Sequence, residues 1–244
     1  MDLSAFIIKG WTFPAPSLIL EENHPKEVPM KQAVICFTRV PRPGQTKTRL
    51  MPRLSEEQCA RLHWAFLRDL AEIYSTVDAD LLVAHTPDPD WEALKGVFPK
   101  AVFFPQEGPD LGAKMNHALN FALARGYETC VLTGSDLPLM TGDHLLSGFD
   151  ALETADVTLG PTADGGYYLV GVKAPAPYLF ENQTYGAGSV FDNAVAAVLA
   201  AGKSFRPALA CDDVDTPEDL QKLIQHLDPN SHTAACLRTF GVTP

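Results

Sequence analysis

The residues best suited to bind phosphate lie together in one short segment. Positions 39–53 read RVPRPGQTKTRLMPR and carry five basic residues and no acidic one, although the whole chain has a formal net charge of −11. The basic residues are Arg39, Arg42, Lys47, Arg49 and Arg53. Guanidinium and ammonium groups match phosphate oxygens, and Gly44 lets the backbone of such a loop approach a ligand. The segment therefore predicts a site for a di- or triphosphate, with a solvated basic surface as the alternative.

Acidic side chains that could hold a metal ion occur at two distant points. Asp136 directly follows an apolar run that ends at Gly134, and Asp215 lies much later, just before Thr216. Mg²⁺ often takes one or two carboxylates together with substrate phosphates and water. We therefore predict that Asp136 and Asp215 bind a divalent cation near residues 39–53, which we call the basic loop. The alternatives are that Asp136 caps a turn and that Asp215 serves the start of a helix.

A third candidate is the segment Asp164-Gly165-Gly166-Tyr167. Two glycines between strands are typical of a hairpin turn, and on these residues alone the turn is the favoured interpretation. The functional alternative is a backbone that a sugar or another acceptor can approach. In that case Tyr167 or Tyr168 would form a stacking wall, and Asp164 would accept a hydrogen bond from a hydroxyl group.

Several function classes are disfavoured. The sequence contains no G-x-x-x-x-G-K-[ST], G-x-S-x-G or H-E-x-x-H motif. The acidic net charge argues against nucleic acid and anionic membranes as partners. No apolar run near the N-terminus is long enough to span a bilayer. The five cysteines are widely spaced and form no C-x-x-C pair, which is typical of reduced thiols in a cytoplasmic protein.

Apolar runs and helical periodicities alternate from residue 33 onward. We expect strands near 33–38, 80–84, 101–105, 129–134, 156–160 and 167–172, and helices near 55–74, 111–125, 141–152, 189–201 and 216–227. This alternation predicts an α/β fold, a three-layer α/β/α sandwich with a mostly parallel sheet in a single domain. We place that domain at 31–228, with an N-terminal extension at 1–30 and a C-terminal tail at 229–244. The basic loop and Asp136 should then meet at the carboxyl edge of the sheet.

Five motifs in fixed order carry a resemblance to a known family. Residues 37–50 read FTRVPRPGQTKTRL, beside that family's F-A-K-x-P-x-P-G-x-x-K-T-R-L. The second motif is PQ with DLG within 105–112, and the third is GSDLP at 134–138. The fourth is GP with DGGYYL within 160–169, and the fifth is DVDTPEDL at 213–220. In these motifs the chain resembles the bacterial nucleotide-diphospho-sugar transferase-like proteins. That resemblance implies the glycosyltransferase-A fold, which is similar to the fold of the molybdenum-cofactor and phospholactate guanylyltransferases.

The resemblance also implies a role for each segment. The loop would surround the nucleotide phosphates through Arg39, Gly44, Lys47 and Arg49. A base pocket would be lined by Gln106, Asp110, Leu111 and Gly112. The divalent metal, Mg²⁺ or Mn²⁺, would be held by Asp136 and Asp215, with Asp213 in support. The sugar or acceptor would be bordered by Asp164, Gly165, Gly166 and Tyr167.

Our leading prediction is an enzyme that transfers a sugar from a nucleoside-diphosphate sugar to a small-molecule acceptor. Metal and basic groups would neutralise the leaving diphosphate, Asp136 would be catalytic through the metal, and Asp164 is the one general base we would test. The alternative is a nucleotidyltransferase, in which an acceptor phosphate attacks the α-phosphorus of a nucleoside triphosphate and releases pyrophosphate. A third and weaker hypothesis is a nucleotide-binding protein without catalytic activity.

Overall fold

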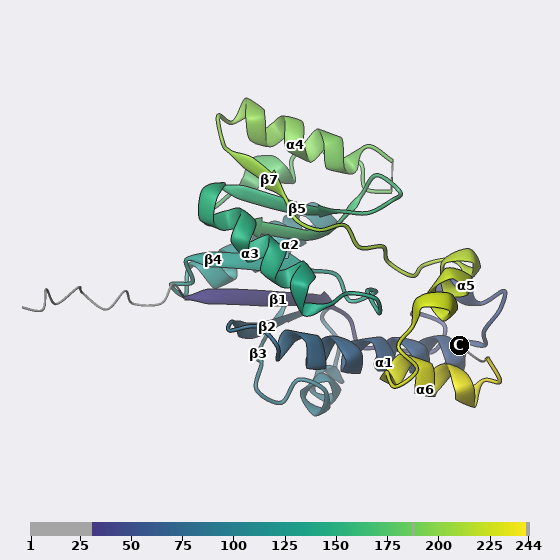
Figure 1. The fold of residues 1–244 in the computed structure, drawn as a ribbon. Coiled ribbons are helices and arrows are strands. Elements are labelled where there is room, and N and C mark those ends of the chain that lie inside the picture. The colour runs from purple at the N-terminus through teal and green to yellow at the C-terminus, as the bar shows by residue number, and fades with distance from the viewer. Residues whose placement is uncertain (1–30, 187, 243–244) are drawn as a thin grey trace, which may run out of the picture.

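A seven-stranded sheet runs through the computed structural model, which describes residues 31–186 and 188–242 (Figure 1). The strands are β1 (Gln32–Thr38), β2 (Asp80–His85), β3 (Val102–Pro105), β4 (Thr129–Thr133), β5 (Val157–Pro161), β6 (Tyr167–Val172) and β7 (Phe205–Pro207). Their order is β3-β2-β1-β4-β6-β5-β7, and β6 runs antiparallel to both of its neighbours while the other pairs are parallel. The predicted α/β class with a mostly parallel sheet in one domain is confirmed.

Helices cover both faces of this sheet (Figure 1). They are α1 (Glu56–Tyr74), α2 (Leu111–Leu123), α3 (Gly142–Thr154), α4 (Val190–Ala200), α5 (Pro217–His226) and α6 (His232–Thr239), with 3₁₀ turns η1 (Thr48–Leu50), η2 (Trp91–Gly96) and η3 (Pro177–Leu179). Ala33 and Ile35 of β1 pack in the core shared with α2 and α4, whereas Val34 and Cys36 pack in the core shared with α1 and α3. A strand covered on both faces needs apolar residues at every position, which explains the continuous apolar run of β1.

The strand order changes direction beside β1. The chain runs from β1 through β2 to β3 on one side and then returns to place β4 on the other side. Ligand crevices in open α/β sheets form at such a point, outside the carboxyl ends of the strands. Cys36 of β1 is paired with Thr133 of β4. Arg39 and Asp136, which follow these two strands, therefore leave the same edge of the sheet.

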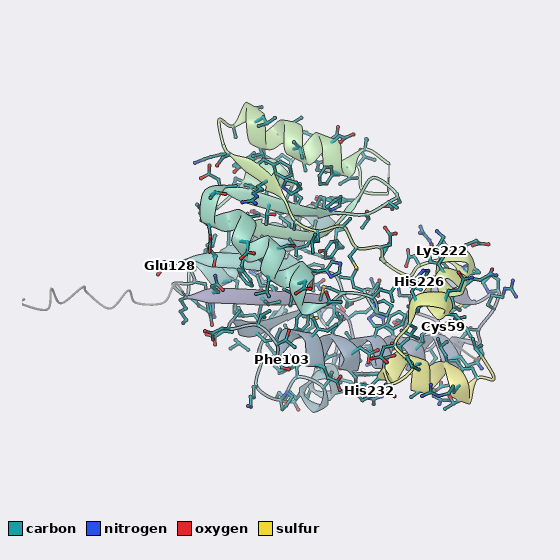
Figure 2. All side chains as sticks on the ribbon, viewed as in Figure 1. Cys59, Phe103, Glu128, Lys222, His226 and His232 are labelled. Atoms are coloured by element: carbon teal, nitrogen blue, oxygen red, sulfur yellow. The ribbon has the colours of Figure 1, made fainter. Side chains whose placement is uncertain are left out.

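The C-terminal segment differs from the predicted tail at 229–244. Residues 232–239 form α6, and Ala234 and Leu237 are buried in a third core with α1 and α5 (Figures 1 and 2). The carboxylate of Asp69, on α1, accepts hydrogen bonds from the backbone N–H groups of His232 (2.7 Å) and Thr233 (3.0 Å). Ser231 also caps this helix locally by accepting a 3.1 Å hydrogen bond from the N–H of Ala234, but the part of the cap that comes from α1 leaves no local pattern in the sequence.

Other expectations concern the chain ends and the thiols. The predicted extension at 1–30 lies outside the described residues. Among the helices that the structure describes, none combines the length and apolar character needed to cross a membrane. All five cysteines are free, and only Cys236 is not fully buried.

Candidate functional site

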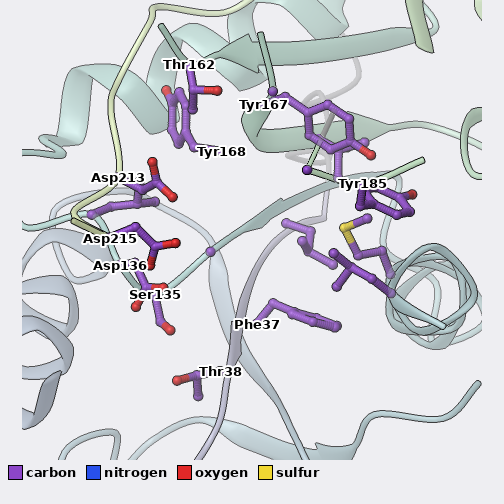
Figure 3. A pocket seen from close by; sticks show the side chains of 18 of the residues that line it. Phe37, Thr38, Ser135, Asp136, Thr162, Tyr167, Tyr168, Tyr185, Asp213 and Asp215 are labelled. Carbon is purple, nitrogen blue, oxygen red and sulfur yellow. The ribbon is translucent and has the colours of Figure 1, made fainter. Parts of the chain in front are cut away.

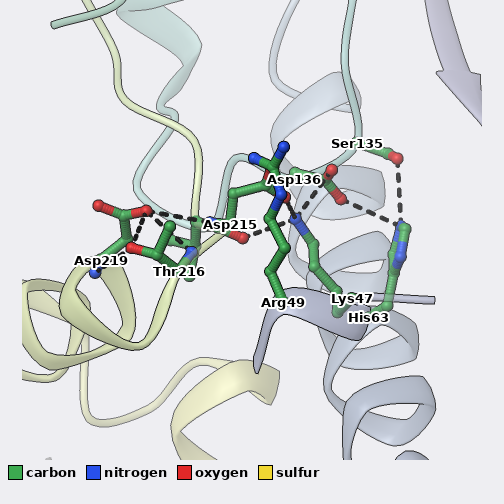
Figure 4. Close-up of polar contacts among 9 residues, drawn as sticks. Lys47, Arg49, His63, Ser135, Asp136, Asp215, Thr216 and Asp219 are labelled. Carbon is green, nitrogen blue, oxygen red and sulfur yellow. Dashed lines mark hydrogen bonds and ion pairs between the residues drawn. The ribbon is translucent and has the colours of Figure 1, made fainter. Parts of the chain in front are cut away.

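Lys47 joins the segments that carry the acidic residues (Figure 4). Its ammonium lies 2.8 Å from Asp136 Oδ2 and 3.1 Å from Asp215 Oδ1, and it donates a hydrogen bond of 2.6 Å to the carbonyl oxygen of Val214. A lysine ammonium has three donors, so all of them are directed at groups of the protein. The side chain is only 2% exposed. Lys47 thus holds the loop after β1, the loop after β4 and the segment before α5 at one point.

The backbone at Lys47 is strained. Its φ of 52° and ψ of 40° place it in the left-handed region, just before η1. A residue with a side chain reaches this region at a cost of about 1–2 kcal/mol. The surrounding contacts must offset that cost, because this conformation keeps the buried ammonium between the two carboxylates.

The basic loop divides into paired and available cations. Arg42 forms ion pairs with Asp88 and Asp90, each 2.6 Å long, so it follows the alternative interpretation of a basic group facing the protein's own acids. The three donors of Lys47 face groups of the protein here, and its predicted contact with phosphate stays a prediction. Arg49 contacts Asp215 at 3.0 Å but is 72% exposed, and Arg39 is exposed. These two arginines are the groups of the loop best placed to meet an anionic ligand.

Asp136 lies between Lys47 and a histidine that the sequence analysis missed. His63 Nε2, on α1, is 3.1 Å from Ser135 Oγ and 3.6 Å from Asp136 Oδ1. Burial lowers the pKa of His63 to about 4, so its imidazole is neutral at pH 7. Burial opposes the ionisation of Asp136, but Lys47 and then His63 outweigh it and hold the pKa of Asp136 below its usual value. Asp136 is therefore a carboxylate.

His63 could not be recognised from spacing, because it belongs to the buried side of α1 beside Leu62 and Phe66. A histidine there is usually a core residue with a local partner. The available signal was weaker: a buried polar group needs a hydrogen-bond partner, and a strand end beside the helix is one place where it can find one.

The two late aspartates behave differently. Asp215 accepts contacts from both Lys47 and Arg49. Burial, followed by repulsion from Asp215, raises the pKa of Asp213 to about 6. Within residues 31–186 and 188–242, no three His, Cys, Asp or Glu side chains are grouped closely enough to hold a metal ion by themselves. Asp213 lines the same cavity as Asp136 and Asp215, and its supporting role at a metal stays a prediction.

Two pockets of 470 and 300 Å³ meet at these residues. Both are lined by Arg39, Arg49, His63, Asp136 and Asp215. The smaller pocket continues along residues 45–48 of the basic loop. The larger pocket runs from the acidic residues to a group of aromatic and aliphatic side chains, and Figure 3 shows Tyr167 and Tyr185 on the side away from Asp136 and Asp213. The structure thus brings the basic loop and both predicted metal ligands to one cavity.

Only two of the four residues predicted to form a base pocket line the larger pocket. Gln106 and Leu111 line the larger pocket, whereas Asp110 and Gly112 do not. Asp110 instead caps α2 by accepting a 2.8 Å hydrogen bond from the N–H of Ala113. A Cβ on Gly112 would lie 2.8 Å from the hydroxyl oxygen of Tyr185, so this glycine makes room for that side chain.

Gln106 itself is held rigidly at the end of β3. Its Nε2 donates to the carbonyl oxygens of Thr38 and Ala84, both at 2.9 Å. Because an amide nitrogen has two hydrogens, only the carbonyl oxygen of Gln106 is left for a ligand.

The Asp164 segment is the hairpin turn between β5 and β6. Asp164 Oδ1 accepts hydrogen bonds from Thr162 Oγ1 and from the N–H of Gly166. Gly165 has a φ of 85°, and a Cβ there would overlap the backbone of Gly188. Asp164, Gly166 and Tyr167 line the larger pocket, but Asp164 already has a structural task, which weakens its case as a general base. Gly44, with a φ of 73°, supports the turn of the basic loop without lining either pocket.

Comparison with known proteins places this geometry in a family. The model of a family described as "Uncharacterized protein conserved in bacteria (DUF2064)" matches residues 69–187. The crystal structure of a "putative nucleotide-diphospho-sugar transferase" from Desulfovibrio desulfuricans G20 is 31% identical, covers 86% of this chain and 95% of its own, and superposes with a TM-score of 0.81.

Two curated relatives have named activities. A phosphoenolpyruvate guanylyltransferase from Sphaerobacter thermophilus is 27% identical over 200 residues, which are 79% of this chain and 93% of the relative. A 2-phospho-L-lactate guanylyltransferase from Methanothermobacter thermautotrophicus is 27% identical over 205 residues, which are 81% of this chain and 86% of the relative. Both are transferases of nucleotidyl groups by name.

Proposed function

Since the chain belongs to the DUF2064 family of nucleotide-diphospho-sugar transferase-like proteins and is a transferase, we propose that it transfers a nucleotidyl group from a nucleoside triphosphate to a phosphorylated acceptor. Pyrophosphate is the second product. This is the alternative rather than the leading prediction from the sequence, because the relatives with named activities are guanylyltransferases. Their names make GTP the first nucleotide to test.

The observation that carries this proposal is the junction of the two pockets at Asp136 and Asp215. Nucleotidyl transfer breaks the bond between the α- and β-phosphates, so the leaving pyrophosphate and the nucleoside need separate spaces on either side of the reacting phosphorus. The smaller pocket, beside the basic loop, suits the β- and γ-phosphates. The larger pocket suits the nucleoside and the acceptor.

The charge of the smaller pocket supports a metal-dependent reaction. Its lining contains the cations Arg39, Lys47 and Arg49 and the carboxylates Asp136 and Asp215, which leaves one net positive charge while His63 is neutral. A triphosphate carries several negative charges, so a further cation is needed. Asp136 Oδ1 is buried and has no hydrogen-bond partner among the described residues, so it is an available ligand atom.

We therefore propose that Asp136 and Asp215 hold Mg²⁺ or Mn²⁺ together with phosphate oxygens. When bound, the cation supplies neutralisation of the charge that develops on the α-phosphate and on the leaving pyrophosphate. Lys47 keeps the two carboxylates close together, and Arg39 and Arg49 stabilise the leaving group from the loop.

The reaction requires little proton transfer by groups of the protein. An oxygen of the acceptor phosphate attacks the α-phosphorus, a new P–O bond forms, and the bond to the β-phosphate oxygen breaks with its electron pair on pyrophosphate. An ionised phosphate is already nucleophilic, so no general base is required, in agreement with the structural role of Asp164. Positioning and charge stabilisation account for catalysis.

Release of pyrophosphate tests the proposal. The protein is incubated with Mg²⁺, one nucleoside triphosphate and a panel of phosphorylated acceptors, and in parallel with UDP-, GDP- and CDP-sugars. We expect pyrophosphate only in the triphosphate arm, and a loss of at least about 100-fold in kcat for Asp136→Asn. Transfer or hydrolysis from a sugar nucleotide without pyrophosphate would support glycosyl transfer instead. Nucleotide binding without turnover, unchanged in Asp136→Asn, would support the inactive binding protein.

A further inference from the structure

The far end of the larger pocket has a different character from the end beside Asp136. We call it the aromatic end and define it by Phe37, Leu111, Met115, Tyr167, Tyr185 and Val190. These residues come from β1, the first half of α2, the start of β6, the segment before α4 and the first residue of α4. Their rings and alkyl groups line a pocket that also contains charged residues, and Figure 3 shows Tyr167 and Tyr185 on the side away from Asp136.

The polar side-chain groups of the aromatic end are the two tyrosine hydroxyls, and none of its six side chains is charged. The hydroxyl oxygens of Tyr167 and Tyr185 are buried and have no hydrogen-bond partner within the described residues. Burial, followed by the neighbouring phenol of Tyr185, raises the pKa of Tyr167 far above its usual value, so both groups are neutral. Among the described residues that line the larger pocket, the cations are Arg39 and Arg49. Both belong to the basic loop at the opposite end.

A nucleobase would find more hydrogen-bond partners in another part of the larger pocket. Base recognition depends on hydrogen bonds, and a pocket built from polar groups discriminates far better than an apolar one. Thr38, Thr86 and Gln106 line the part of the larger pocket formed by the ends of β1, β2 and β3. The carbonyl oxygen of Gln106 is an acceptor fixed by two backbone contacts. This arrangement suits an edge of a base that donates hydrogen bonds.

We propose that the aromatic end binds the organic part of the acceptor, and that this part is an apolar or aromatic group without a carboxylate. The inference rests on the nucleotidyl transfer proposed above and names the class of its second substrate: a phosphate monoester with an apolar substituent. Its phosphate lies toward Asp136, where one oxygen attacks the α-phosphorus and pyrophosphate leaves. A carboxylated acceptor, such as the compounds in the names of the two guanylyltransferases, would find no cation at this end to pair with.

Two simple phosphate monoesters separate these possibilities by isothermal titration calorimetry. Phenyl phosphate carries a ring, and phosphoenolpyruvate carries a carboxylate on a small body. Each is titrated into the full-length protein saturated with Mg²⁺ and a non-hydrolysable α,β-methylene analogue of GTP. Because burial of a phenyl ring removes apolar area from water, we expect phenyl phosphate to bind roughly tenfold more tightly than phosphoenolpyruvate. Equal binding, or tighter binding of phosphoenolpyruvate, would overturn the proposal.

A charge placed at the aromatic end provides the complementary test. Leu111 is 43% exposed at the start of α2, so Leu111→Arg should fold. The proposal moves Leu111 from the predicted base pocket to the acceptor site. We therefore expect Leu111→Arg to weaken the binding of phenyl phosphate and to tighten that of phosphoenolpyruvate by several-fold each, with nucleotide affinity changed by less than about twofold. The matched control is Leu199→Arg, which adds the same charge at a leucine that is 61% exposed on α4 and does not line the pocket. If Leu111→Arg instead altered mainly the affinity for the nucleotide, the aromatic end would belong to the nucleoside and the proposal would fail.

The failure of this inference can be told from the failure of the proposed function. Titrations of the two phosphates do not require turnover, and they can be repeated without the nucleotide analogue. If the protein prefers phenyl phosphate but never releases pyrophosphate, the proposed aromatic acceptor site is supported and the proposed nucleotidyl transfer is contradicted. If the protein releases pyrophosphate but prefers phosphoenolpyruvate, nucleotidyl transfer is supported and the proposed class of acceptor is contradicted.

Discussion

Lys47 connects three segments that are far apart in the sequence, and its ammonium has three acceptors within 3.1 Å. Breaking a buried ion pair by removing one partner leaves uncompensated charge and is usually costly. Here the two carboxylates are each about one third exposed, so solvent relieves part of that cost.

The first prediction at this scale concerns stability. Lys47→Met keeps most of the side-chain volume and removes the charge, and we expect it to lower the free energy of unfolding by about 2 kcal/mol, less than the full cost of a completely buried pair. Urea denaturation measures the change. Arg49→Met is the matched control, because Arg49 contacts the same Asp215 but is 72% exposed; its change should stay within about 0.5 kcal/mol. Equal losses in both variants would show that Lys47 is not the connecting residue.

A second residue-scale prediction concerns the thiols. Burial raises the pKa of Cys36 and of Cys130 to about 12, and the thiolate is the form that reacts with alkylating reagents. We expect N-ethylmaleimide to modify the partly exposed Cys236 in the native protein and the other four cysteines only after unfolding. Mass spectrometry of digested peptides reports the sites. Modification of Cys36 or Cys130 at the rate of Cys236 would contradict the burial described here.

At the scale of elements, α6 depends on a carboxylate from another helix. Asp69, which is 6% exposed, accepts hydrogen bonds from two N–H groups at the start of α6 and from the hydroxyl of Thr233. The first N–H groups of a helix need such partners, and a negative charge there also interacts favourably with the helix dipole. The cap attaches the C-terminal helix to α1, whose buried side carries His63 to the site.

This role predicts the outcome of two substitutions. Asp69→Ala leaves the N–H groups of His232 and Thr233 unpaired, while Ser231 still accepts from Ala234. We expect it to lower the free energy of unfolding by about 2 kcal/mol, whereas Asp69→Asn keeps an acceptor and should cost about half as much. Urea denaturation measures both, and amide hydrogen exchange should report faster exchange in α6. If Asp69→Ala unfolded at the urea concentration of the unmodified protein, the cap would not be holding the helix.

Elements were also what the sequence predicted best. Apolar alternation and the capping boxes at Ser55 and Thr216 depend on neighbours along the chain, and the corresponding strands and helices are present. The three-residue strand β7 and the helix α6 were not predicted. β7 is defined by its pairing with β5, and α6 is capped by the distant Asp69 as well as by its own Ser231.

At the scale of the whole molecule, the site also has parts that depend on neighbours along the chain and parts that depend on distant contacts. Strand order places the basic loop and Asp136 at one edge, and that could be anticipated from residues at strand ends. Whether Lys47 faces phosphate or the protein's own carboxylates depends on contacts across 168 positions, which no local pattern records. The division of the cavity into a side beside the basic loop and an aromatic side likewise appears only once α2, α4 and the hairpin after β5 are assembled.

The central claim is that the leaving pyrophosphate and the nucleoside occupy different pockets that meet at Asp136 and Asp215. Crystals grown with Mn²⁺ and α,β-methylene GTP test it most directly, because manganese is located by its anomalous scattering. We predict a manganese peak in contact with both carboxylates, with the β- and γ-phosphates beside Arg39 and Arg49 in the smaller pocket. A peak remote from Asp136, or phosphates seated at the aromatic end, would contradict this account.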